Sequence, residues 1–327
     1  MRMLINSKKR LATLLGGMTL LALAIGTNVF VKNLKELRNE TAATFRSRSA
    51  LIETFIALHR DQVSVMRNLL AANYAQNGAG SLPYSLRQHP QQHVWELIST
   101  DQMLAGTLTG SASHLPSAEQ LREIQAATAL DAQTRPALAY SKEVTWLYYL
   151  SANNFIYLAP KAPISQFHFQ PALYQRDYWR DAGPQANPQR RMVLDGPYED
   201  MAGKGWILTL AEPVYAADTF LGVVALDLRI DTLQHLTRVG SAISDTMMIS
   251  EDYQLIARNE AFQPGIRLQP PLSDGLIEWR KDANGDAWLS TPVVKDELWV
   301  VHQLKQSDLF WAAAQASRPT WVMIALA

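Results

Sequence analysis

The chain has 327 residues, and its thirty basic and thirty acidic side chains cancel to a formal net charge of zero at neutral pH. A neutral chain lacks the basic surface of a general nucleic-acid binder, so we expect no nucleic-acid partner. It contains no cysteine, which excludes disulfides, thiolate metal sites and a cysteine nucleophile. The length suits about two domains.

The N-terminal sequence predicts a membrane anchor. Residues 1–10 hold four basic side chains and no acidic one, and residues 11–31 hold no charged side chain at all. An apolar run of about twenty residues spans a bilayer as a helix. The preceding positive charges keep the N-terminus in the cytoplasm, and membrane lipid is then an expected partner. A cleavable signal peptide is the alternative, because Ala22-Leu23-Ala24 resembles a cleavage site.

The C-terminal sequence predicts the start of a second transmembrane helix. Residues 307–327 form an exit helix in which Arg318, Pro319 and Trp321 precede an uninterrupted apolar run. The alternative is a short terminal helix packed in the core. Two spans would place the segment between them outside the cytoplasm. Any cytoplasmic output domain would then follow beyond this chain.

A long helix is expected over residues 32–76, directly after the first span. Its apolar residues recur at steps of three or four, without proline or glycine. The helix can pack on its own domain or on a second copy of the chain, so a homodimer is expected. The full apolar set is not a strict heptad, and paired helices are therefore only weakly indicated.

The first half of the exported segment predicts two hairpins and three helices. Strands are expected at 144–151 and 155–160 around an Asn153-Asn154 turn, and at 206–215 and 220–228 around Ala217-Asp218. Residues 93–100 and 117–130 look helical, the second with a capping box of Ser117 and Gln120, and a short helix is expected at 231–238.

The second half predicts a smaller antiparallel sheet. Its expected strands, each bounded by turn residues, are 246–250, 253–258, 276–280, 287–294 and 298–304. The expected class is therefore α+β, with a membrane-distal module at 77–238 and a membrane-proximal module at 239–306.

This order of elements resembles the double-Cache, PAS-like sensor domains of bacterial membrane receptors. The strings AEPVYAADTFLGVVALDLRIDTL and EVTWLYYLSANNFIYLAP carry the likeness, which is greatest to the periplasmic part of membrane-bound diguanylate cyclases. The resemblance implies a periplasmic ligand sensor and a cytoplasmic GGDEF domain that makes cyclic di-GMP. No GGDEF string occurs in this chain. Histidine kinases and chemoreceptors use the same sensor fold and are the alternative.

The resemblance also implies a ligand site in the distal module. Amino-acid-binding members of the family share an arginine, two adjacent aromatics, a Tyr-x-Asp string and a distant aspartate. The matching residues are Arg176, Tyr178, Trp179, Tyr198, Asp200 and Asp227. Arg176 and an aromatic group would hold a carboxylate, and the two aspartates an ammonium. The order Tyr-Trp departs from the family's Trp-Tyr, so another small anion, amine or polar ligand, or a purely structural role, remains open.

Asp227 is notable without the resemblance, because it ends the apolar run FLGVVALDL. Such a run reads as a buried strand, in which a carboxylate is costly unless it is paired. By alternation Asp227 shares a face with Val223 and Ala225. A bound cation or Arg176 would satisfy it, and capping of the 231–238 helix or bonding to nearby amides is the alternative.

Other candidate sites are weak, and we expect no metal and no cofactor. His89 and His93 are spaced as two ligands on a helix but lack a third, and the loop Asp282–Asp286 is a turn rather than a calcium site. His168 alternates with phenylalanines as a packed strand residue. No catalytic residues are expected, because no nucleophile–base arrangement occurs, and an anchored periplasmic hydrolase is disfavoured.

Overall fold

The computed structural model describes residues 2–76, 84–99, 104–238, 243–259, 263–273 and 275–326, with side chains from residue 14 onward. The chain divides into two compact units. The first unit holds residues 1–51, 237–254 and 267–327, and the second unit holds residues 52–236 and 255–266. Helix and antiparallel sheet are mixed, as the sequence predicts.

A single helix, α1, runs from Arg2 to Gln76 without interruption. It joins the predicted span and the predicted long helix, because no residue between them breaks the hydrogen-bond pattern. Its first described turns expose large apolar side chains, among them Leu14, Leu20 and Leu21. Within the described residues it is the one helix long and apolar enough to cross a membrane, with a mean hydropathy of 1.9 in its most apolar window. The basic side chains before residue 14 lie outside the described part.

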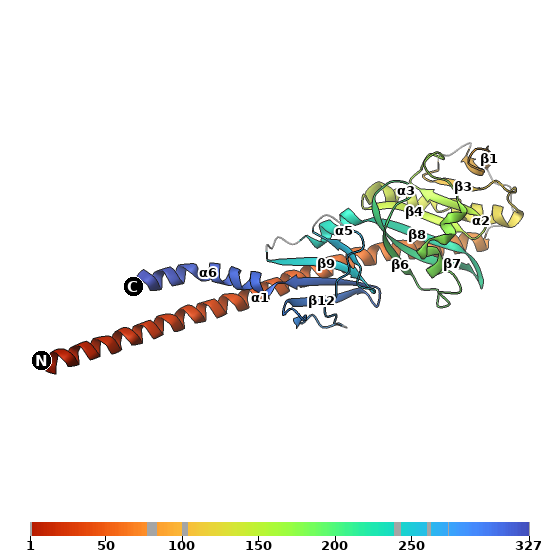
Figure 1. The fold of residues 1–327 in the computed structure, drawn as a ribbon. Helices are drawn as coiled ribbons and strands as arrows, with labels where there is room; N and C mark the ends of the chain where they lie inside the picture. The colour runs from red at the N-terminus through yellow and green to blue at the C-terminus, as the bar shows by residue number, and fades with distance from the viewer. Residues whose placement is uncertain are drawn as a thin grey trace. The chain divides into compact units, whose positions relative to one another are not determined.

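Helix α6, Gln306–Leu326, packs along α1 within the first unit (Figure 1). The rings of Phe30 and Phe310 lie 5.3 Å apart, and Asn33 donates a 3.0 Å hydrogen bond to Ser317. The Trp321 ring lies directly over Gly26, where any side chain would collide with it. The helix extends through the predicted exit segment, and a second span at this end stays a prediction.

The smaller sheet has five antiparallel strands in the order β10-β9-β13-β12-β11. Their bounds are Ser244–Ser250 (β9), Leu255–Arg258 (β10), Arg280–Lys281 (β11), Ala287–Val294 (β12) and Leu298–Leu304 (β13). The last two match their predicted ranges. The strand predicted at 276–280 is wrong, because pairing with β12 begins only at Arg280.

The larger sheet belongs to the second unit and has eight antiparallel strands in the order β1-β2-β3-β5-β4-β8-β7-β6. Its bounds are Tyr84–His89 (β1), Val94–Ser99 (β2), Thr107–Ser111 (β3), Val144–Ser151 (β4), Phe155–Ala159 (β5), Val193–Glu199 (β6), Trp206–Ala216 (β7) and Thr219–Arg229 (β8). Both predicted hairpins form, and Asn154 takes the left-handed backbone that asparagine tolerates in a tight turn.

In the part of the chain that the structure describes, four helices and one 3₁₀ turn accompany the larger sheet. They are α2 (Ala118–Thr128), α3 (Asp131–Tyr140), α4 (Asp177–Ala182) and α5 (Ile230–Thr237), and the turn η1 covers Pro171–Gln175. The predicted capping box of Ser117 and Gln120 is present at α2. The helix predicted at 93–100 is wrong, because residues 94–99 pair with β1 as a strand. Helix α3 and strands β1, β3 and β6 lack a clear local pattern and were not predicted.

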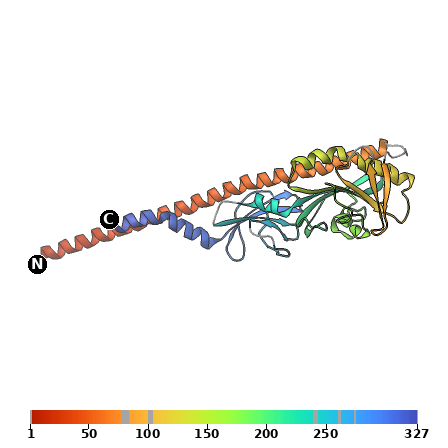
Figure 2. The same ribbon diagram turned by 90° about the horizontal axis from the view of Figure 1, so that it is seen from above.

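The two faces of the larger sheet carry different elements. Alternation along β4 turns Tyr149 toward Glu123 of α2, with a 2.6 Å hydrogen bond, and turns Tyr148 toward Tyr178 of α4, with the rings 5.8 Å apart. The second part of α1 follows the α2 side of the sheet (Figure 2). The sheet therefore separates α1 from the face that carries α4.

Candidate functional site

A cavity lies in the second unit on the α4 face of the larger sheet. Its empty space is about 390 Å³, part of which is open to solvent. Most of its wall is aromatic and aliphatic, with one arginine and two aspartates among the lining residues. The lining residues are Trp146, Tyr148, Ile156, Leu158, Phe167, Leu173, Arg176, Tyr178, Tyr198, Asp200, Met201, Ile207 and Asp227.

The junction of η1 and α4 brings Arg176 and Tyr178 to the cavity. Arg176 ends η1 and precedes α4 in extended backbone, so two short helical turns meet at its position. The backbone N–H of Tyr178 donates a 3.0 Å hydrogen bond to Asp195 Oδ2, which ties the start of α4 to β6. The tie fixes where Arg176 enters the cavity.

Asp227 is bound by hydroxyl groups from two neighbouring strands. Its Oδ1 accepts a 2.7 Å hydrogen bond from Thr209 of β7 and a 3.3 Å hydrogen bond from Tyr148 of β4. Tyr198 extends this network, with its hydroxyl 2.5 Å from that of Thr209. Neither Arg176 nor a helix cap supplies these bonds, so those two expectations for Asp227 are wrong.

Burial makes Asp227 a weak acid. The residue is 4% exposed, and desolvation raises the pKa of its carboxyl from 3.8 to about 8. The hydrogen bonds from Thr209 and Tyr148 oppose this rise, while the nearby Asp200 and Asp195 add to it. A positive group placed in the cavity would favour the ionised carboxylate and reverse the shift.

The surrounding phenols remain neutral hydrogen-bond donors at physiological pH. Burial raises the pKa of Tyr148, Tyr178 and Tyr198 well above the usual value, and the Asp227 carboxyl raises it further. Burial likewise raises the pKa of Asp195. The cavity wall therefore offers several fixed tyrosine O–H donors that carry no negative charge.

Arg176 is half-buried, and its guanidinium carbon lies 5.3 Å from the centre of the Tyr198 ring. Within the described part of the chain it makes no ion pair with a carboxylate. Stacking of this kind orients a guanidinium while leaving its N–H groups free along their own plane. Arg176 is thus a positioned donor for an anionic group in the cavity.

Asp200 also borders the cavity, from the turn between β6 and β7. Its Oδ2 accepts a 2.9 Å hydrogen bond from the backbone N–H of Lys204, which holds the turn closed. Trp179, by contrast, is not among the lining residues. Its ring packs 4.6 Å from Tyr174 and 5.5 Å from Phe220. Five of the six predicted site residues therefore meet at the cavity. Trp179 instead packs α4 against Tyr174 and Phe220 outside the cavity.

Several lining residues were missed by the sequence reasoning. Trp146 and Tyr148 alternate along VTWLYYLS, so their common face was readable, but nothing local marked that face as a cavity wall. Met201 comes from a turn, and Phe167 from an irregular segment. The partner role of Thr209 depends on its register opposite Asp227, which a single sequence does not reveal.

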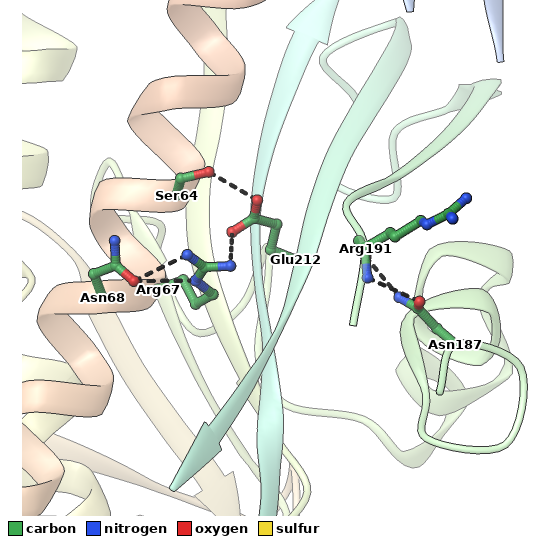
Figure 3. A network of polar contacts seen from close by, with 6 residues as sticks. All are labelled: Ser64, Arg67, Asn68, Asn187, Arg191 and Glu212. Carbon is green, nitrogen blue, oxygen red and sulfur yellow. Dashed lines mark hydrogen bonds and ion pairs between the residues drawn. The ribbon is translucent and has the colours of Figure 1, made fainter. Parts of the chain in front are cut away.

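A second polar network joins β7 to α1 (Figure 3). It lies on the opposite face of β7 from Thr209, because side chains three residues apart on a strand point to opposite faces. Glu212 is 6% exposed, and its Oε1 accepts a 2.8 Å hydrogen bond from Ser64 of α1. Its Oε2 lies 3.2 Å from the guanidinium of Arg67, also on α1, and Arg67 in turn contacts Asn68. Strand β7 therefore carries the hydrogen-bond partner of Asp227 on one face and an attachment to α1 on the other.

The remaining candidates are structural. His89 lies 3.0 Å from Glu96, His93 contacts the Pro90 carbonyl, and the described residues include no group of three or more side chains arranged to hold a metal. Asp282 closes its own loop by accepting from the amides of Asn284 and Asp286. His168 contacts the Ile164 carbonyl outside any strand, so its assignment as a strand residue is wrong.

No family model matches the chain, and no curated protein matches it. Several solved structures, by contrast, do match the chain. The ligand-binding domain of the Pseudomonas fluorescens chemoreceptor CtaA, in complex with L-isoleucine, is 16% identical with a TM-score of 0.53, covering 87% of this chain and 97% of that one. The sensory domain of the Campylobacter jejuni chemoreceptor Tlp3, with isoleucine bound, is 11% identical with a TM-score of 0.51 and the same coverage.

The fold also occurs outside chemoreceptors. The extracellular domain of the histidine kinase rpHK1S-Z16 is 12% identical with a TM-score of 0.54, covering 84% of this chain and 97% of that one. At these identities the likeness establishes that the chain shares the fold of these solved domains, and it establishes the fold alone.

Proposed function

We propose that this chain is the periplasmic ligand-sensing region of a bacterial inner-membrane receptor of the double-Cache type. Its ligand is a small polar molecule of the amino-acid or amine class. The observation that carries the proposal is that one cavity is lined both by Arg176, which has no ion pair with a carboxylate among the described residues, and by the buried carboxyl of Asp227. A cavity with a guanidinium and a titratable buried carboxyl suits a ligand that bears both charges, because the ligand's ammonium would favour the ionised form of Asp227.

The chemistry of an amino acid matches these groups. Its carboxylate would accept two hydrogen bonds from Arg176, which presents N–H groups as a fork. Its ammonium would meet Asp227, whose Oδ2 has no hydrogen-bond partner among the described residues, and Asp200 nearby. The solved CtaA and Tlp3 domains of the same fold carry isoleucine, which supports this class.

A simple amine is the second ligand class, and it would use the aspartates alone. The two classes separate in one experiment on the whole chain in nanodiscs, with calorimetric titration of amino acids and of the matching amines. Arg176→Ala should abolish amino-acid binding and leave amine binding in place, whereas Asp227→Asn should weaken both. Arg180→Ala is the matched control, because Arg180 lies on α4, four residues after Arg176, is exposed and pairs with Asp177.

A thermal-shift screen precedes the titration. A ligand at about one hundred times its Kd stabilises the native state by roughly 2.7 kcal/mol. The proposal fails if every hit binds the Arg176→Ala and Asp227→Asn variants as tightly as the natural chain.

Transmission of the ligand signal from the cavity to α1 would start from β7. A ligand that draws Asp227 into its ionised form changes the bonds of Thr209, and β7 also holds Glu212 against α1. Movement of one strand relative to this attachment would shift α1 between two packings, and α1 carries the proposed membrane span.

The output domain belongs to the same proposal. We infer a GGDEF diguanylate cyclase, working as a homodimer, from the local likeness of the two hairpin strings. A histidine kinase or chemoreceptor output fits the shared sensor fold equally well. The full-length protein incubated with GTP should yield cyclic di-GMP. Autophosphorylation from ATP, or methylation without either nucleotide reaction, would identify the alternatives.

A further inference from the structure

Two aromatic residues flank Arg176 in the sequence without lining the cavity. Tyr174 stands two residues before it in η1, and Trp179 stands three residues after it in α4. Both side chains are half-buried, and they meet each other outside the cavity, with ring centres 4.6 Å apart. We call this pair of residues the clamp.

The Tyr174 hydroxyl ties η1 to the turn between β4 and β5. It accepts a 2.9 Å hydrogen bond from the backbone N–H of Asn154 and donates a 2.6 Å hydrogen bond to the backbone carbonyl of Ser151. Burial raises the pKa of Tyr174 to about 12, so the phenol keeps its proton at physiological pH. The hydroxyl therefore fastens η1 to the sheet just before Arg176.

The turn between β4 and β5 is a firm anchor, because helix α2 also holds it. The side-chain amide of Asn153 donates a 2.6 Å hydrogen bond to Glu123 Oε2, and the Ser151 hydroxyl donates to the other oxygen of this carboxyl group. Gln120 donates a further 2.8 Å hydrogen bond to the Asn153 carbonyl. Glu123 is fully buried, and a buried carboxyl group with several hydrogen bonds is costly to displace. Tyr174 thus binds backbone groups that are themselves fixed.

Trp179 completes the clamp on the other side of Arg176. Its ring packs on Tyr174 and also on Phe220 of β8, whose ring centre lies 5.5 Å away. The backbone carbonyl of Arg176 accepts a 3.1 Å hydrogen bond from the N–H of Trp179. Tilted and edge-to-face ring pairs prefer a defined geometry. The backbone at Arg176 is therefore held by a hydrogen-bonded phenol before it and by packed rings after it.

We propose that the clamp positions Arg176 and thereby makes the cavity selective for ligands that carry a carboxylate. This inference rests on the proposed sensing function. A guanidinium binds a carboxylate through two parallel hydrogen bonds, and a fixed backbone lowers the entropic cost of that geometry. The ammonium of a ligand would instead meet Asp227 and Asp200, which belong to β8 and to the turn after β6 and not to η1 or α4. Loss of the clamp therefore weakens amino-acid binding and spares amine binding.

Tyr174→Phe tests the clamp, because it removes only the hydroxyl. Calorimetric titration of the full chain in nanodiscs uses the standard amino acids as probes, together with the amine that lacks the carboxylate of the tightest one. The variant should bind that amino acid about tenfold more weakly, as for the loss of a hydrogen bond to a fixed partner. It should bind the amine as tightly as the natural chain does. Equal weakening of both probes, or unchanged amino-acid binding, would overturn the proposal.

Tyr157→Phe is the matched control. The Tyr157 hydroxyl also has two partners, Thr134 at 2.9 Å and Asp131 at 3.0 Å. Tyr157 alternates along β5 with the cavity residues Ile156 and Leu158, so it points to the opposite face of the sheet. Its variant should lose thermal stability and still bind both probes normally.

Two variants at Trp179 test the aromatic half of the clamp. Trp179→Ala should weaken amino-acid binding several-fold and leave amine binding unchanged. Trp179→Phe keeps a ring and should restore most of the amino-acid affinity. Natural affinity in Trp179→Ala would contradict the clamp.

Hydrogen exchange of the ligand-free chain tests the clamp without any probe. The Asn154 amide donates to the Tyr174 hydroxyl, so it should exchange faster in Tyr174→Phe and at the natural rate in Tyr157→Phe. Unchanged exchange in Tyr174→Phe would refute the clamp. Failure of the natural chain to bind any probe, together with faster exchange in Tyr174→Phe, would refute the proposed sensing function and leave the clamp in place, so the two failures are distinguishable.

Discussion

Neutralising Asp227 should change how the stability of the ligand-free protein depends on pH. In the native state its carboxyl has a pKa of about 8, because it is desolvated on the sheet, whereas its ordinary value is 3.8. Between these two values the native state holds one proton more than the unfolded state. The free energy of unfolding therefore falls as pH rises, and the contribution is lost as pH passes the native pKa.

The magnitude follows from the width of this window. One pKa unit corresponds to about 1.4 kcal/mol, so the chain should lose about 3 kcal/mol of stability from Asp227 between about pH 5 and pH 7. Asp227→Asn keeps the shape of the side chain and removes the proton equilibrium. Its slope of stability against pH should be flatter by about 1.4 kcal/mol per unit.

The assay is denaturant unfolding of the full chain in detergent at a series of pH values. Asp231→Asn is the control. It removes an exposed carboxyl that pairs with Arg229 and retains Asp227, so it should keep the natural slope. An Asp227→Asn variant with the natural slope would refute the assignment of a buried, protonated carboxyl to this strand.

Three further predictions concern the cavity, the α1 attachment and the smaller sheet. Binding of an ammonium ligand below about pH 8 should release a proton from Asp227, so the binding enthalpy should vary with the ionisation enthalpy of the buffer, and Asp227→Asn should remove that variation. Glu212→Gln should destabilise the second unit by about 2 kcal/mol, because it leaves Arg67 without its carboxylate. Ser64→Ala should cost about 1 kcal/mol. Equal stability of Glu212→Gln and the natural chain would contradict this. Burial lowers the pKa of His302 to about 4, so the unfolded state gains the proton first and stability should fall as pH drops below about 6.5. His302→Leu should lack that acid sensitivity in the same unfolding series.

Local patterns were sufficient for the elements whose residues interact mainly with sequence neighbours. The range of β4 and the hairpin turn after it were predicted, because alternation and an Asn-Asn turn act within a few residues. The cap of α2 was predicted for the same reason. Residues 94–99 were not, because their strand state comes from pairing with β1 and not from their own pattern.

The sequence by itself determined the apolar N-terminal helix, the order of the hairpins and the presence of a carboxyl at the end of a buried strand. Tertiary structure decided what that carboxyl meets. Registers between β4, β8 and β7 placed the hydroxyls of Tyr148 and Thr209 at Asp227, because strand pairing joins residues that are far apart in the chain. Tertiary packing also placed Trp179 against Tyr174 and away from the cavity. Only packing could divide the apolar residues of α1 into buried and exposed ones, since both kinds are apolar and differ in what covers them.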